Sequence, residues 1–124
     1  MREIKDHIVQ GDSINHQLAI VVTDQPGSGG ANHEYEVRLP TELGAVKVCR
    51  IEFQNGPIKE VGVNGLTQEA LLAIVIDRLK SFQAGPFASD DNQQALHFAE
   101  TSLFFLQERT RKRIARGVEG THQK

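Results

Sequence analysis

Three arginines near the end of the chain have the type and spacing to bind phosphate. Arg109, Arg113 and Arg116 follow one another at intervals of four and three residues, so in a helix they share one face, and Arg111 and Lys112 are expected to point elsewhere. A guanidinium group donates paired hydrogen bonds to phosphate oxygens, a geometry that lysine lacks. A solvated basic helix end, which the helix macrodipole favours, explains the same residues equally well. The spacing therefore predicts either an anion site or an ordinary basic last turn.

Aromatic and amide side chains earlier in the second half add another chemical signal. Phe82, Phe87 and Asn92 lie close together in the sequence. An aromatic ring offers a purine base a face to stack on, worth about 1–3 kcal/mol per base. An asparagine amide presents a donor and an acceptor together, which suits an adenine edge. With the arginines, these residues point to a nucleotide; the alternative is that both phenylalanines are core or loop-anchoring residues.

No pattern in the sequence builds an active site, so we expect no catalytic residue, metal or cofactor. The segment 27–31 (GSGGA) matches neither a phosphate-binding loop nor a nucleophile elbow. His97 and Glu100 lie one helical turn apart, but a carboxylate-bundle metal site needs further ligands from facing helices. The single cysteine, Cys49, lies on an alternating stretch that is typical of a small core residue, and its lack of a partner fits a reducing cytosol.

The first half of the chain, residues 1–64, predicts a small antiparallel β-sheet. Three stretches carry strand signals, either β-branched residues or polar–apolar alternation: 16–23, 33–39 and 45–53; a fourth, residues 4–9, is short and mixed. Asn55-Gly56 is typical of a type I′ turn, so residues 57–63 are expected to return as a paired strand. The glycine-rich segment 25–32 has no core-forming residue and predicts a loop.

Residues 65–117 predict a hairpin of two long helices. Thr67 is the expected N-cap of a first helix that covers residues 70–82. Pro86 ends this helix because proline cannot continue the hydrogen-bond ladder.

A second helix is expected from about Asp90 to Arg116, where Gly117 closes it. Ser89 is its expected N-cap, and at a rise of about 1.5 Å per residue the helix is roughly 40 Å long. Phe104 and Phe105 are expected to pack against the first helix.

Together these elements predict a single α+β domain over residues 1–124: an N-terminal small antiparallel β-sheet followed by a C-terminal helical hairpin. Residues 118–124 are expected to form a flexible tail. The longest apolar run, 70–76, is far shorter than the roughly 20 residues of a membrane span. The N-terminus lacks a signal-peptide core, so neither membrane insertion nor export is expected.

The geometry of a long helix places a condition on any shared site. Asn92 and Arg109 are 17 residues apart, hence about 25 Å apart along one helix. One small ligand cannot touch both within one chain, whereas two antiparallel copies would bring them together. The helix segment 70–76 is apolar on every side, which favours a partner chain as well. The alternative is that the chain's own sheet covers this helix.

The charge distribution argues against a surface that follows a nucleic-acid backbone. The net charge is −2, and residues 1–64 carry 6 basic against 9 acidic side chains. Only residues 109–116 form a basic cluster, with five Lys/Arg and no acid. A nucleic-acid-binding protein generally presents a more extended basic stripe.

Two segments, residues 82–92 (FQAGPFASDDN) and 108–121 (ERTRKRIARGVEGT), resemble a phage hairpin domain. That domain is shared by the phage anti-Thoeris sponge family and the anti-CBASS cyclic-oligonucleotide sponges. A β-rich first half fused to the hairpin is similar to the anti-Thoeris branch. The resemblance covers residues 66–121 directly and the first half by its architecture.

The resemblance implies a phage-encoded, non-enzymatic anti-defence protein acting in the host bacterial cytoplasm. Such a protein binds the cyclic ADP-ribose isomer (glyco-cyclic ADP-ribose) made by a Thoeris TIR protein, without cleaving it. The NAD-depleting effector is then never activated. Family members form homodimers, and some form hexamers.

The resemblance also implies roles for individual residues. Phe82 would stack on the adenine, and Asn92 would hydrogen-bond nearby. Arg109 and Arg113 of the partner chain would clamp the diphosphate. Arg116 would add a further positive charge, and Phe87 would shape the hairpin loop.

Some members of the family carry a second pocket, for cyclic trinucleotides, near the hairpin loop. Here Asp90 and Asp91 occupy that loop, where a basic residue would suit an anionic ring, so trinucleotide binding is in doubt. Two other functions stay open: a basic-helix nucleic-acid-binding protein and a structural interaction protein.

Overall fold

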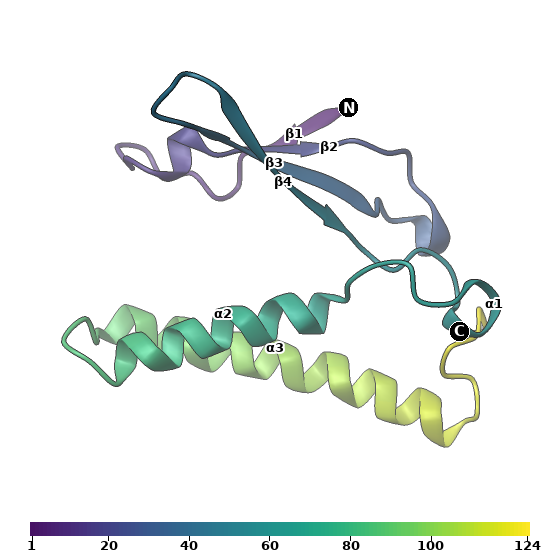
Figure 1. Cartoon of the computed structure of the whole chain (residues 1–124). Helices are drawn as coiled ribbons and strands as arrows, with labels where there is room; N and C mark the ends of the chain where they lie inside the picture. The colour runs from purple at the N-terminus through teal and green to yellow at the C-terminus, as the bar shows by residue number, and fades with distance from the viewer. The chain divides into compact units, whose positions relative to one another are not determined.

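The computed structural model describes residues 1–124, which divide into two compact units (Figure 1). The sheet unit combines Met1–Gly56 with Val63–Gly65, and the hairpin unit combines Pro57–Gly62 with Leu66–Lys124. The first unit holds all the β-strands and the second all the α-helices. The predicted α+β class, with a sheet first and long helices after it, is confirmed.

The sheet unit is a four-stranded antiparallel sheet in which strand order follows chain order. Its strands are β1 (Arg2–Ile4), β2 (Ala19–Val22), β3 (Glu34–Pro40) and β4 (Val46–Glu52). Val21 and Val22 of β2 are its buried apolar residues. Two short 3₁₀ turns, η1 (Asn15–Gln17) and η2 (Ser28–Gly30), lie in the connections.

Three sequence predictions for this half are wrong. The first strand covers residues 2–4 and not 4–9, since residues 5–9 form turns and irregular backbone. Residues 57–63 do not return as a strand; they contain α1 (Ile58–Val61), a single helical turn. A type I′ turn needs a positive φ at both central residues, and no residue other than glycine has one here. Asn64 closes the connection instead, because its amide bonds the backbone N–H and carbonyl of Asn55 at 2.8 Å each. Cys49 is exposed on β4 rather than part of the core, because neither face of this strand is well covered: every β4 residue except Ile51 is exposed.

The hairpin unit is built from α2 (Gln68–Gln83) and α3 (Asp90–Ala115), as predicted. Hydroxyl groups cap both helices: the Oγ1 atom of Thr67 accepts from the backbone of Ala70, and the Oγ atom of Ser89 accepts from that of Asn92, each at 3.1 Å. Gly117 (φ 74°) ends α3. Its N–H and that of the next residue bond back into the last turn at 3.0 Å, the pattern of a Schellman motif.

The two helices pack along a seam of buried and half-buried residues that recur at intervals of three and four. On α2 these are Leu72, Ile76, Leu79 and Gln83; on α3 they are Leu96, Ala99, Leu103, Leu106, Thr110 and Arg113. Ile76 and Leu96 are the most buried, at 6 % and 7 % exposure. This is the packing pattern of a two-helix coiled coil.

Several large apolar side chains lie outside this seam. Phe104 and Phe105 are 50 % and 64 % exposed, so the prediction that they pack against the first helix is wrong. They fall between the seam positions 103 and 106 and therefore point away from α2. Ile74 and Val75 on α2 are also exposed. None of the helices is both long and apolar enough to span a bilayer.

Candidate functional site

A pocket of about 500 Å³ lies at the C-terminal end of α3. We call it the basic pocket; its lining residues are Phe105, Glu108, Arg109, Lys112, Arg113, Arg116 and Lys124. Five of the seven are cationic, one is aromatic and one is a carboxylate. The volume falls within the range of small-molecule sites, about 300–1,000 Å³.

The pocket is positioned by the helical repeat of α3. Phe105, Arg109, Lys112 and Arg116 follow one another at intervals of four, three and four residues, so they form one stripe along the helix. The carbonyl groups of the last turn place negative partial charge at this end of α3, which favours cations there. Mutual repulsion among the crowded cations is relieved when an anion binds between them.

Arg109 and Lys112 are free to receive such an anion. Neither side chain makes a hydrogen bond or an ion pair within the chain. The guanidinium group of Arg109 therefore keeps all five of its donors. Of the three predicted phosphate-binding arginines, only Arg109 has no hydrogen-bond partner within the chain.

Arg113 and Arg116 are engaged by the segment that follows α3. The guanidinium group of Arg113 donates to the main-chain carbonyls of Val118 and Thr121, each at 3.0 Å, and of Gln123, at 2.5 Å. The Nη2 atom of Arg116 donates to the carbonyl of Lys124 at 2.6 Å. The structure thus gives residues 118–124 a defined path beside the basic pocket.

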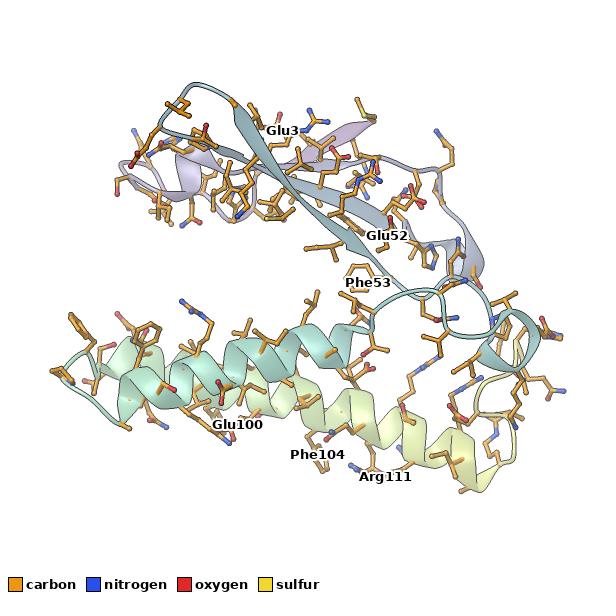
Figure 2. The ribbon with its side chains drawn as sticks, in the orientation of Figure 1. Glu3, Glu52, Phe53, Glu100, Phe104 and Arg111 are labelled. Atoms are coloured by element: carbon orange, nitrogen blue, oxygen red, sulfur yellow. The ribbon has the colours of Figure 1, made fainter.

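Neighbouring side chains on α3 stabilise one wall of the pocket. Glu108 accepts from the guanidinium group of Arg111 at 3.3 Å. That same group lies over the ring of Phe104, 5.6 Å from its centroid. Figure 2 shows Phe104 and Arg111 projecting from the same side of α3. Arg111 is thus occupied outside the pocket.

The other predicted site residues gather at the opposite end of the hairpin. We call Phe82, Phe87 and Asn92 the aromatic end. Phe82 is 40 % exposed in the last turn of α2, and the guanidinium carbon of Arg78 lies 5.5 Å from its ring centroid, a cation–π contact. Phe87 is exposed in the connecting loop. The side-chain amide of Asn92, in the first turn of α3, makes no hydrogen bond within the chain.

The loop at the aromatic end is held by Gln83. Its side-chain amide donates to the carbonyl of Ser89 at 3.1 Å and accepts from the backbone N–H of the same residue at 3.0 Å. It also bonds the amide of Gln93 at 3.2 Å. These contacts fix the loop that presents Phe87.

Within one chain the basic pocket and the aromatic end stay apart. The connecting loop and residues 118–124 lie at opposite ends of α3 (Figure 1). Asn92 and Arg109 are about 25 Å apart along the helix at 1.5 Å per residue. The structure therefore brings the three arginines together, and Phe82 with the hairpin loop, but it does not join the two groups.

The histidine and carboxylate weighed as metal ligands have other contacts. Glu100 lies 3.9 Å from the Nζ atom of Lys80, and the His97 ring packs edge-on against Phe98. The chain contains no group of three or more His, Cys, Asp and Glu residues arranged to hold a metal ion.

Sequence reasoning missed several of the residues that complete these surfaces. Phe105 lies one turn before Arg109, so its spacing carried the signal. Lys112 was expected to point away from the arginine face, but it lines the pocket, because three residues after Arg109 is also a helical interval. Arg78 lies one helical turn before Phe82, and this spacing is also visible in the sequence. Nothing in the sequence indicated Lys124, whose place depends on the turn after Gly117.

Comparison with known proteins adds two findings. The family model described as "Acb2/Tad1, hairpin domain" matches residues 46–111, from β4 through most of α3. A protein named "Thoeris anti-defense 1", from Bacillus phage SBSphiJ7, is 45 % identical over 80 residues, which are 64 % of this chain and 56 % of that protein. The chain thus matches little more than half the length of this relative. The family match includes the aromatic end and Arg109 and stops before Arg113.

Proposed function

The chain belongs to the Acb2/Tad1 hairpin-domain family, and on this basis we propose that it is a phage anti-Thoeris protein that sequesters a signalling nucleotide. The ligand is a cyclic ADP-ribose isomer of the glyco-cyclic type, made by a Thoeris TIR protein in the infected host cytoplasm. The chain holds this ligand without cleaving it, so the NAD-depleting effector is not activated. No cofactor takes part.

The basic pocket is the observation that carries this proposal. A diphosphate placed there meets the unpaired guanidinium group of Arg109 and the ammonium group of Lys112. Charge-assisted bonds of this kind are about twice as strong as neutral ones. The carboxylate of Glu108, in the same wall, accepts hydrogen bonds from ribose hydroxyls, which suits an ADP-ribose ligand better than a bare polyphosphate.

A second copy of the chain completes the site. Two hairpins side by side and antiparallel place the aromatic end of one chain against the basic pocket of the other, and two-fold symmetry then creates two equal sites. Phe82 stacks on the adenine, Asn92 bonds its edge, and Arg109 and Arg113 of the partner clamp the diphosphate. The secondary contacts are Phe87 and Arg116. Exposed apolar residues such as Ile74 and Phe98 are covered in such a dimer; a hexamer built from such dimers is the alternative assembly.

Cyclic trinucleotides are not part of the proposal. Asp90 and Asp91 are exposed beside the hairpin loop. Two carboxylates there repel an anionic ring.

A mixed dimer tests the ligand and the shared site together. Chains carrying Phe82→Ala and chains carrying Arg109→Ala are co-expressed with different tags and purified through both. Each variant alone is expected to lose binding of glyco-cyclic ADP-ribose, measured by calorimetry. In the mixed dimer one of the two sites keeps both native residues, so binding returns at half the native stoichiometry.

Other outcomes decide against parts of the proposal. If the mixed dimer fails to bind while the native protein binds, the site is not shared between chains. If the native protein binds no cyclic ADP-ribose isomer, the sponge function is wrong. Binding of RNA or duplex DNA that weakens steeply with salt would then favour a nucleic-acid-binding protein, and no nucleotide binding at all would favour a structural interaction protein.

A further inference from the structure

Residues 118–124 fold back onto the hairpin unit at a fixed place. We call this segment the strap. After the turn at Gly117, the hydroxyl group of Thr121 donates to the carbonyl of Val118, and its backbone N–H donates to the same carbonyl at 3.1 Å. The backbone N–H of Gln123 donates to the Thr121 hydroxyl oxygen at 3.3 Å. The strap is therefore a compact turn with its own hydrogen bonds.

The single-turn helix α1 anchors the strap. The carbonyl of Gly120 accepts from the backbone N–H of Lys59 at 3.0 Å, and His122 bonds the carboxylate of Glu60 at 2.8 Å. Gly120 has a positive φ of 77°, and a Cβ atom added there would lie 2.8 Å from the Cγ2 atom of Ile58. The positive φ favours glycine at this position, and a side chain there would have to displace Ile58.

The anchored strap holds the guanidinium groups of the basic pocket. Its carbonyls take three hydrogen bonds from Arg113 and one from Arg116. The carbonyls that Arg113 binds are neutral amide groups, so these bonds fix its guanidinium group without cancelling its charge. The strap lies outside the residues matched by the family model, which end at 111.

We propose that the strap is a positioning element that orders Arg113 and Arg116 for anion binding, with α1 as its anchor. The inference rests on the proposed function for the identity of the nucleotide, but it concerns the pocket itself. A flexible arginine loses rotamer freedom when it binds a ligand, and ordering it beforehand removes that cost. Releasing two arginines is expected to weaken anion binding about tenfold.

Two glycine substitutions separate the effect of displacing the strap from the effect of backbone strain. Gly120→Val drives a side chain into Ile58 and dislodges the strap from α1 without changing any charge. Gly44→Val is the matched control, because Gly44 has nearly the same φ of 79° and nothing within 4 Å of its added Cβ. Both substitutions place valine at a positive φ, but only Gly120→Val brings the new side chain into contact with Ile58.

Two measurements on the native chain and both variants test the proposal. Side-chain NMR of the arginines reports whether Arg113 is held: its Nη protons are expected to be resolved and slowly exchanging in the native chain and the control, and averaged in Gly120→Val. Calorimetry with inorganic pyrophosphate and with glyco-cyclic ADP-ribose reports affinity, which is expected to fall about tenfold in Gly120→Val alone, while the melting of α2 and α3 stays unchanged.

The possible failures are distinguishable. If Gly120→Val frees Arg113 but binds pyrophosphate as tightly as the control does, the strap does not position the pocket and the proposal is wrong. The same follows if the native chain does not bind pyrophosphate. If the native chain binds pyrophosphate but no cyclic ADP-ribose isomer, only the proposed nucleotide function fails, and the effect of Gly120→Val on pyrophosphate still decides the role of the strap.

Discussion

Arg109→Ala should separate ligand binding from folding more cleanly than any other change in the basic pocket. The Arg109 side chain is exposed and has no partner within the chain, so its removal leaves no group unpaired. Surface substitutions of this kind change stability by no more than about 0.5 kcal/mol. Thermal unfolding followed by circular dichroism at 222 nm is therefore expected to match the native protein.

The loss in binding follows from the contacts that Arg109 offers. Two charge-assisted hydrogen bonds to a diphosphate, at about 1.5 kcal/mol each, amount to about 3 kcal/mol. Since every 1.4 kcal/mol is a factor of ten, the dissociation constant is expected to rise more than a hundredfold. A site of nanomolar affinity then no longer retains its ligand through a wash.

Calorimetry with glyco-cyclic ADP-ribose measures this change, and Lys80→Ala provides the control. Lys80 also carries one positive charge on the hairpin, but it faces Glu100 at 3.9 Å and does not line the pocket. Lys80→Ala is expected to bind as the native protein does. Equal affinity of the Arg109→Ala protein and the control would refute the assignment of Arg109 to the phosphate site.

Three further predictions concern other parts of the molecule. Phe82→Ala is expected to weaken binding by the free energy of stacking one base, about 1–3 kcal/mol. Helix melting should not change, because Phe82 is partly exposed. Unchanged calorimetric affinity would contradict the stacking role. Leu96→Ala removes a buried seam residue and is expected to destabilise the hairpin unit by about 2–5 kcal/mol, measured by denaturant titration at 222 nm; a loss below about 1 kcal/mol would show that the seam is not the core. Burial raises the pKa of Asp24, but hydrogen bonds from His33, Glu34 and Asn32 outweigh it, so the pKa lies below its ordinary value of 3.8. The stability that Asp24 adds is therefore present above pH 3.8 and is lost as the pH falls through the lower pKa of the folded state. Fluorescence of Tyr35, the single tyrosine in a chain without tryptophan, reports this loss in the sheet unit. Asp24→Asn should flatten that part of the acid titration.

The hairpin could be predicted from the sequence because its determinants are local. Thr67 and Ser89 lie three residues before the backbone groups they cap, and Gly117 ends α3 by its own positive φ. The row from Arg109 to Arg116 follows from the helical repeat alone. Each of these features needs only a few neighbouring residues to form.

The features that sequence reasoning missed depend on contacts between distant residues. Asn55-Gly56 is typical of a hairpin turn, yet Asn64 satisfies the backbone of Asn55 and leaves no strand to pair. Phe104 and Phe105 are apolar, but residue type does not distinguish a position that faces α2 from an exposed position on the same helix. The strap binds through main-chain carbonyls, which every residue carries, so its composition does not indicate its role.

The most direct test of the central claim is the identity of the nucleotide that the protein retains. The purified chain is mixed with cyclic ADP-ribose isomers, washed and heat-denatured, and the released material is identified by mass spectrometry. We predict intact glyco-cyclic ADP-ribose at about one molecule per chain, as two sites in a dimer require. Release of linear ADP-ribose would mean that the protein cleaves its ligand, and release of no nucleotide would contradict the sponge function.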